Sequence, residues 1–272
     1  MYPWRKILVP TDFSTAAAWV FDDAIRAASL TGAEIMILHV RMTHPSKPEL
    51  LRFPADASVY EYAEQQELDL LRRYVERSAQ DLKTTLLVRT APDPAAEIFR
   101  SAKEADVDLI VMATHARHHI AHLFIGSNTM KMLSRCSIPI LAIRYGIKKR
   151  RATRTIAVPV ESANTIPPVL KLVGEIARNE GSEVHLLSCA SGDQRAAAAE
   201  SLDRATAQLE GLIVRKSVIE AKSLGRELVR YSEANDIDLI AIPPDCDREG
   251  KLSGTADGIV RQASSPVLVV PG

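Results

Sequence analysis

The chain has few of the features that mark membrane proteins or proteins that bind nucleic acids. Its 34 Lys and Arg residues equal its 34 Asp and Glu residues, so the bulk charge favours neither nucleic acid nor a membrane surface as a partner. Aromatic residues make up only 5% of the chain, which is few for a surface that stacks bases. No apolar run approaches the roughly 20 residues that span a bilayer.

Cysteine is also scarce. Cys136, Cys189 and Cys246 are odd in number and widely spaced, which fits neither a disulfide framework nor a zinc site. The first residues lead directly into a predicted strand and lack the long apolar core of a signal peptide. We therefore expect reduced, buried thiols and a cytoplasmic location.

One stretch of the sequence occurs twice. The first copy reads Lys6-Ile-Leu-Val-Pro10-Thr-Asp12, and the second reads Thr155-Ile-Ala-Val-Pro159-Val-Glu161. In both copies the next apolar run follows after the same interval, and each copy later reaches Asp-Leu-Ile and ends in an apolar run opened by proline. A repeat of this length indicates two copies of one domain rather than a solenoid. We predict domains at 1–146 and 155–272, joined by a linker at 147–154, with the second domain degenerate.

The pattern within each repeat predicts an α/β fold. In the first repeat, strands are expected near 6–10, 34–40, 84–89, 108–113 and 138–143, and helices near 15–30, 58–81, 94–104 and 127–135. The apolar runs are continuous rather than alternating, which is typical of parallel strands covered by helices on both faces. Ser14 is the expected N-cap of the first helix, and Gly32 is its expected C-terminal cap.

Two segments differ between the repeats or lie between them. The second repeat is shorter, and the residues it lacks correspond to a proline-containing stretch at 43–60, which is predicted to be a loop or lid. The basic run at 146–154 could bind an anionic partner, but a solvated linker is the more common role of such a run.

Taken together, these motifs resemble the universal stress protein family. The matching segments are Ile7-Leu-Val-Pro-Thr-Asp12-Phe-Ser14, Leu38-His-Val40, Asp93-Pro-Ala-Ala-Glu-Ile98, Asp108-Leu-Ile-Val-Met-Ala-Thr-His-Ala-Arg117, Gly126-Ser127 and Ser137-Ile-Pro-Ile-Leu-Ala-Ile143. The resemblance covers nearly the whole chain as two tandem copies. It implies five-stranded, mainly parallel sheets whose last strands pair within the chain as a pseudo-dimer, with a further homodimer possible.

The resemblance also implies where a nucleotide would bind. Family members that bind ATP have an aspartate at a strand end, which contacts adenine. They also have a loop that wraps the phosphates. This loop begins with Gly-x-x-Gly, continues for nine residues and ends in Gly-Ser or Gly-Thr. Glycines let backbone N–H groups approach the phosphates, and the helix that follows attracts the anion. The candidate contacts in repeat one are Pro10, Thr11, Asp12, Val40, Met112, Ala113, Ala116, Gly126, Ser127, Asn128 and Thr129.

Repeat one keeps only part of this pattern. Ala113 and Ala116 stand where the family has paired glycines, which predicts weakened rather than absent binding of ATP or a related nucleotide. A positive φ at either position would cost about 1–2 kcal/mol. Asp12 and the Gly126-Ser127 pair also have simpler interpretations, as helix-capping residues.

Repeat two departs further from the pattern. Glu161 replaces the aspartate, Pro243 and Cys246 replace the paired glycines, and the loop before Gly254-Thr255 is two residues shorter. We therefore expect repeat two to be a structural partner without an ATP site.

Four histidines lie close together in the loop of repeat one. His115, His118, His119 and His122 would have metal-binding spacing on a helix, but the family places a loop here. A polar, partly exposed loop is the simpler interpretation.

The sequence leaves three hypotheses about function. The first is a non-enzymatic nucleotide sensor or scaffold that acts on an unknown protein partner. The second is an interaction protein in which both ligand sites are relics. The third is a slow ATPase or a protein that binds metal through the histidine loop. No catalytic constellation stands out, so an enzyme is the weaker expectation.

Overall fold

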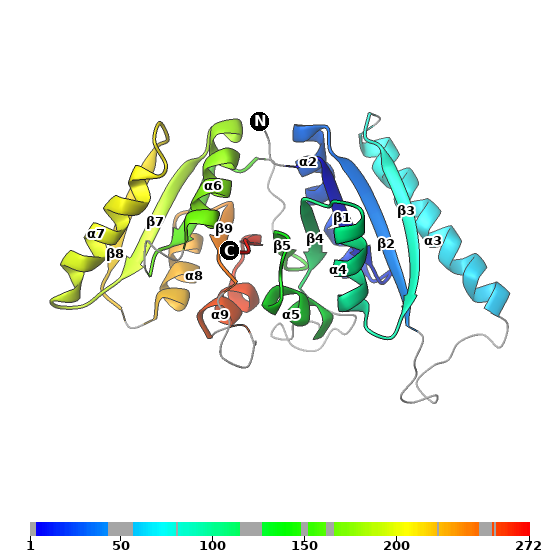
Figure 1. The fold of residues 1–272 in the computed structure, drawn as a ribbon. Helices are drawn as coiled ribbons and strands as arrows, with labels where there is room; N and C mark the ends of the chain where they lie inside the picture. Colours follow the sequence, from blue (N-terminus) through cyan, green and yellow to red (C-terminus); the bar gives the residue numbers. More distant parts are fainter. Residues whose placement is uncertain are drawn as a thin grey trace. The chain divides into compact units, whose positions relative to one another are not determined.

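The computed structural model describes residues 4–42, 57–79, 81–114, 127–147, 152–161, 166–221, 223–244, 252 and 254–272. Strands and helices alternate along the chain (Figure 1), which divides into two compact units, Trp4–Val111 and Met112–Gly272. The architecture is α/β, as predicted, with a mostly parallel arrangement of strands.

The first unit, Trp4–Val111, contains parallel strands in the order β3-β2-β1-β4. These strands are β1 (Lys6–Thr11), β2 (Glu34–Met42), β3 (Thr84–Ala91) and β4 (Leu109–Ala113), of which β4 continues into the second unit. The helices are α1 (Thr15–Trp19), α2 (Phe21–Thr31), α3 (Ala57–Ser78) and α4 (Pro94–Glu104). Helix α2 contacts α3, β1 and β2, whereas α4 packs on β2 and β3. Right-handed crossovers place α2 and α3 on one face and α4 on the other, because the strand order reverses between β1 and β4.

The second unit, Met112–Gly272, contains strands in the order β5-β10-β9-β6-β7-β8. Its strands are β5 (Ile140–Ile143), β6 (Thr155–Pro159), β7 (Glu183–Cys189), β8 (Val214–Ile219), β9 (Leu239–Ile242) and β10 (Val267–Val269). Its helices are α5 (Ser127–Ser134), α6 (Pro167–Glu180), α7 (Gln194–Ala207), α8 (Leu224–Ala234) and α9 (Gly254–Gln262). Strands β5 and β10 pair antiparallel, whereas β10 with β9, β9 with β6, β6 with β7, and β7 with β8 pair parallel. Strands β5 and β10, the last strands of the two sequence repeats, are thus neighbours within this unit.

The element predictions hold with one correction. The helix expected at 15–30 is two helices, because Val20 adopts a ψ of −9° and separates α1 from α2. Both predicted caps are present. The Ser14 side chain accepts a hydrogen bond from the N–H of Ala17, and Gly32 has a left-handed φ of 71°.

The repeated sequence produces repeated contacts. Ile7 lies opposite Ile35, and Ile156 lies opposite Val184, so the equal sequence intervals correspond to the same register. Asp108 Oδ2 accepts the N–H groups of Arg5 and Lys6 at 2.8 and 2.9 Å. In the second repeat, Asp238 Oδ2 accepts those of Arg154 and Thr155 at 2.9 and 3.2 Å. Each aspartate thus satisfies backbone donors at the start of the first strand of its repeat.

Buried polar groups also occur away from the strand ends. His185 on β7 is buried, and its Nδ1 lies 2.9 Å from the Tyr231 hydroxyl. Its Nε2 lies 3.4 Å from Glu183, whose carboxylate also contacts Arg215. Burial is the main cause that lowers the pKa of His185 below its usual value of 6.5. The neutral imidazole is therefore the favoured form in the folded protein.

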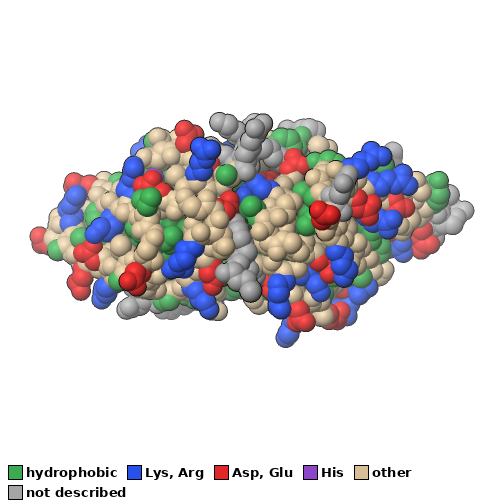
Figure 2. All heavy atoms as spheres, turned by 90° about the horizontal axis from the view of Figure 1, so that it is seen from above, with side chains coloured by type: hydrophobic (Ala, Val, Ile, Leu, Met, Phe, Trp, Pro, Cys, Tyr) green, Lys and Arg blue, Asp and Glu red, His purple; other side chains and the backbone are tan. Residues whose placement is uncertain are grey.

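The surface is mixed in charge. Figure 2 shows acidic and basic side chains interspersed, without a large region of one sign on that face. No helix in the described part of the chain is long and apolar enough to cross a membrane. Cys136 and Cys189 are free thiols, as expected, but both are partly exposed rather than buried.

Candidate functional site

The candidate site of repeat one begins at the carboxyl end of β1. In the unit Trp4–Val111, this strand has the parallel neighbours β2 and β4 on its two sides. The helical connections to such neighbouring strands cross opposite faces of the sheet. Ligands of open α/β sheets bind where the strand order reverses in this way. Pro10 and Thr11 end β1, and Val40 lies on β2 one residue beyond His39, which pairs with Thr11. Pro10, Thr11, Asp12 and Val40 therefore lie at one edge of the sheet of this unit.

The turn after β1 is shaped by its own side chains. Thr11 Oγ1 accepts the N–H of Phe13 at 3.1 Å, and Asp12 Oδ1 accepts the N–H of Ser14 at 3.0 Å. Ser14 Oγ in turn accepts the N–H of Ala17 at 3.1 Å. Phe13 has a positive φ of 59°, which is uncommon for a bulky residue. Asp12 is exposed and supports the turn, but Ser14, rather than Asp12, caps the helix.

A buried histidine fixes this turn to β2. His39 Nδ1 lies 2.8 Å from the carbonyl oxygen of Thr11, and the His39 ring stacks on Phe13 with 4.3 Å between ring centroids. His39 Nε2 lies 3.1 Å from Glu64 Oε1 on α3. The contact with Thr11 requires a hydrogen on Nδ1, because a carbonyl oxygen can only accept.

The Glu64 carboxylate also holds β2 to α3. Its side chain is only 2% exposed, and its two oxygens accept hydrogen bonds from Arg41 Nε at 2.7 and 3.0 Å. Arg41 Nη2 makes a further contact with Glu64, and Nη1 contacts Glu61. Arg41, Glu61 and Glu64 belong to none of the sequence motifs described above. The available signal was a His and an Arg at the end of an otherwise apolar strand.

The second part of the predicted site lies in the unit Met112–Gly272. Met112 is buried and Ala113 is half-buried at the end of β4, and the N–H of Thr114 donates to the carbonyl of Ile143. The buried Thr129 hydroxyl donates to the carbonyl of Ala113 at 3.1 Å, which ties the first turn of α5 to the end of β4. Asn128, in the same turn, is half-buried.

The backbone at Ala113 is not strained. Phe13, Asp106 and Asp236 are the non-glycine residues with positive φ in the described part of the chain. The cost expected for a positive φ therefore does not apply to Ala113. Its methyl group can weaken phosphate binding only by occupying space near the backbone.

Other predicted site residues lie outside the described residues. They are Ala116, Gly126 and the four loop histidines His115, His118, His119 and His122, together with residues 43–56 of the expected lid. The backbone of Ser127 opens α5, but its side chain is not described. Among the described residues, no group of three or more His, Cys, Asp or Glu could hold a metal ion.

Repeat two contains a cavity at the equivalent strand ends. Its volume is about 340 Å³, and its walls come from the end of β6, the end of β9 and the first turns of α9. Ile166, Ile242, Ala256 and Ile259 contribute buried apolar side chains, each at most 3% exposed. Pro159, Pro243 and Pro244 extend the apolar lining. The sequence predicted the loss of the phosphate loop here, but it did not predict a cavity.

The polar groups of this cavity are few. Glu161 provides the one ionisable side chain among the lining residues that the structure describes, and Thr255 provides a hydroxyl. Burial, followed by the charges of Glu227 and Glu161, raises the pKa of the Cys189 thiol at the end of β7. Of these two carboxylates, Glu227 also pairs with Arg230 at 3.2 Å, whereas Glu161 lines the cavity.

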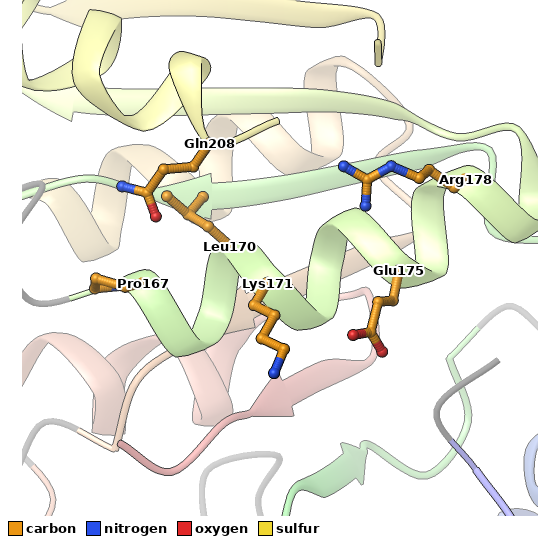
Figure 3. A pocket seen from close by; sticks show the side chains of 6 residues that line it. All are labelled: Pro167, Leu170, Lys171, Glu175, Arg178 and Gln208. Atoms are coloured by element: carbon orange, nitrogen blue, oxygen red, sulfur yellow. The ribbon is translucent and has the colours of Figure 1, made fainter. Parts of the chain in front are cut away.

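A second, shallower depression lies along α6. It measures about 260 Å³, and Figure 3 shows Gln208 directed toward Leu170, whereas Lys171 and Glu175 lie on the other flank of the helix. Pro167 and Arg178 complete its lining. Its charged side chains alternate in sign, as is usual for the solvated face of a helix, so it does not select a ligand class.

Comparisons with known proteins agree with this architecture. A model of the universal stress protein family matches residues 3–144. Universal stress protein YxiE of Bacillus subtilis is 26% identical over 147 residues, which are 52% of this chain and 99% of that protein. Universal stress protein MJ0577 of Methanocaldococcus jannaschii is 24% identical over 157 residues, which are 52% of this chain and 95% of that protein.

Among solved structures, a universal stress protein from Archaeoglobus fulgidus has a TM-score of 0.79 with this chain. The similarity covers 99% of both chains at 16% sequence identity, so it supports the fold alone. The family model, in contrast, matches more than half of the sequence. The chain therefore belongs to the universal stress protein family.

Proposed function

We propose that the protein is a non-enzymatic nucleotide sensor. In this proposal, repeat one binds ATP or a related adenine nucleotide weakly, and a protein partner recognises the bound form. The observation that carries the proposal is the hydrogen bond from the Thr129 hydroxyl to the Ala113 carbonyl. It holds the N-terminus of α5 at the end of β4, where the family pattern places the phosphates.

The physical basis of this proposal is anion binding at a helix N-terminus. The first N–H groups of a helix lack partners within the helix, and together with the helix dipole they attract phosphate oxygens. Within the unit Trp4–Val111, strand β1, which Asp12 follows, has β4 as a parallel neighbour through Ile7 and Leu8. Asp12 would then contact the base, while the turn that it stabilises positions the backbone.

The proposed role of Asp12 is binding rather than catalysis. Its carboxylate already accepts the N–H of Ser14, which favours a fixed, structural position over a base that activates water. Slow ATP hydrolysis is the alternative. Steady phosphate release by the folded protein that disappears in Asp12→Ala would support that alternative against ours.

Calorimetric titration of ATP into the full chain, with and without Mg²⁺, tests the proposal. We expect weak binding that is lost in Asp12→Ala. It should tighten about fivefold in Ala113→Gly, because the variant removes a methyl group near the phosphates, a relief of about 1 kcal/mol. Glu161→Gln is the matched control at the same position of repeat two and should not change binding. Absence of binding heat at several temperatures, in both the parent protein and Ala113→Gly, would favour a ligand-free interaction protein.

The proposal includes an arrangement of the chain. We propose a cytoplasmic protein in which the two repeats form a pseudo-dimer within one chain, with repeat two completing the fold. Support comes from the antiparallel pairing of β5 with β10, in which Leu141 lies opposite Leu268. This pairing removes two strand edges that would otherwise be open to other chains.

A further inference from the structure

The cavity of repeat two provides a second site with a different chemistry. We propose that it binds a small apolar molecule that carries an amino group, with the apolar body against the isoleucines and the ammonium group at Glu161. The apolar lining and its one carboxylate side chain define this class of ligand, which differs from a nucleotide. The site lies within the unit Met112–Gly272 and is separate from the nucleotide site proposed for repeat one.

The position of the cavity is that of a ligand site. Strand β6 has the parallel neighbours β7 on one side and β9 on the other, so the order of the strands reverses at β6. The cavity opens at the carboxyl ends of β6 and β9, at this switch in strand order. Its volume of about 340 Å³ is at the lower end of the range for small-molecule pockets, which fits a ligand of the size of an aromatic amine.

The backbone of repeat two lacks two of the donors that a phosphate-binding loop supplies. Pro243 and Pro244 follow β9 directly, at the positions that correspond to Ala113 and Thr114 in repeat one. Proline has no N–H group, so two successive donors are missing where the family's phosphate loop begins. The proline rings instead present apolar surface to the cavity.

The apolar walls are preformed. Ile166 precedes α6, Ile242 ends β9, and Ile259 lies on α9, and the three side chains are 2%, 2% and 1% exposed. Because they come from three separate elements and are already buried, the walls need little ordering when a ligand enters. An apolar body gains by leaving water for such a surface.

The charge of the site favours a cation. Glu161 lies at the cavity, is exposed, and has no basic partner among the lining residues that the structure describes. Glu227 is paired with Arg230 at 3.2 Å, so Glu161 is the carboxylate that the cavity itself presents. An ammonium group would be attracted to the Glu161 carboxylate, and this attraction sets the amine apart from a carboxylate with the same apolar body.

The experiment compares amines with acids of similar shape. The full chain is labelled with ¹³C at isoleucine methyl groups, and Ile166, Ile242 and Ile259 are assigned by substitution with valine. Tryptamine, 2-phenylethylamine and cyclohexylethylamine are titrated separately, each against a carboxylate with the same apolar body. We expect the three methyl signals to shift and saturate within about 10 mM amine, while the carboxylates have little effect. ATP should leave these three signals unchanged.

Two variants locate the site. Glu161→Gln should weaken amine binding about fivefold, the upper range for a partly exposed ion pair, without changing the fold. Ala256→Leu fills the cavity and should abolish the shifts. Asp12→Asn, at the matching position of repeat one, is the control and should leave amine binding unchanged.

Three results would overturn the proposal. They are the absence of saturable shifts with all three amines, equal binding of the matched carboxylates, and amine binding that persists in Ala256→Leu with its distant methyl signals unchanged. Loss of ATP binding in repeat one would contradict the proposed nucleotide sensor, but not this site, because the two sites share no residue.

Discussion

Glu64 provides the sharpest test of how repeat one is held together near its candidate site. Its buried carboxylate is contacted by Arg41 and His39 on β2, so α3 and β2 are joined by charged groups rather than by apolar packing alone. We expect Glu64→Ala to destabilise the first unit strongly. The variant leaves the Arg41 guanidinium without its main partner at a site that is 30% exposed.

The magnitude follows from what each variant leaves unpaired. Removing one partner of a buried ion pair costs about 3–5 kcal/mol, and the partial exposure of Arg41 together with its contact to Glu61 places Glu64→Ala near 3 kcal/mol. The double variant Arg41→Met/Glu64→Leu removes both charges and keeps the volume. We expect it to lose only about 1 kcal/mol. Replacing a buried pair with apolar groups is often nearly neutral, and the remaining loss comes from His39 Nε2, which no longer contacts Glu64.

Hydrogen exchange is the appropriate measurement, because the chain contains two compact units and a single global transition cannot be assumed. Amides of α3 and β2 should lose protection in Glu64→Ala and regain most of it in the double variant. Urea unfolding of the same proteins provides the free energies of unfolding. A loss below about 1 kcal/mol in Glu64→Ala, or a loss in the double variant as large as that in Glu64→Ala, would refute the reasoning.

Three further predictions concern repeat two. His185→Gln should reduce the loss of stability on acidification from pH 7 to 5. Burial lowers the pKa of His185, so the unfolded chain takes up the proton first. Urea unfolding at several pH values measures this effect, and an unchanged pH dependence in the variant would contradict it. Cys189 should react slowly with iodoacetamide at pH 8, because burial and nearby carboxylates raise the pKa of its thiol. Glu161→Gln should accelerate this reaction, which mass spectrometry follows. Equal rates in the two proteins would contradict this cause. Gly225→Ala should lower the free energy of unfolding by about 1–3 kcal/mol, because its Cβ would lie 3.1 Å from the Thr255 carbonyl oxygen at the start of α9. A thermal scan with an unchanged midpoint would show that α9 can move aside.

Much of the fold could be predicted because its causes are local in sequence. Continuous apolar runs indicated parallel strands, and the equal intervals from Ile7 to Ile35 and from Ile156 to Val184 anticipated equal registers in the two repeats. The caps at Ser14 and Gly32 follow from side-chain chemistry and backbone freedom. The break at Val20 was not predicted, because the apolar periodicity continues through it.

The candidate sites were less predictable because their causes are tertiary. Glu64 is more than 20 residues from Arg41 and His39, and nothing in a polar helix pattern identifies which carboxylate turns inward. In repeat two, the loss of the glycines predicted the loss of phosphate binding. Whether the space then closes depends on how Ile166, Ile242 and Ile259 pack, which the spacing of the sequence does not determine.

The pairing of β5 with β10 has a consequence for how the two repeats can diverge. Two separate chains that pair through their last strands find each other only above a certain concentration, and both must preserve the same surface. Here both strands belong to one chain and one compact unit, so their encounter is intramolecular and independent of protein concentration. A repeat tethered in this way can change its strand-end residues, as Glu161 and Pro243 illustrate, without losing its counterpart. Because the two repeats are covalently linked, the strand-end residues of one repeat can change while those of the other stay the same.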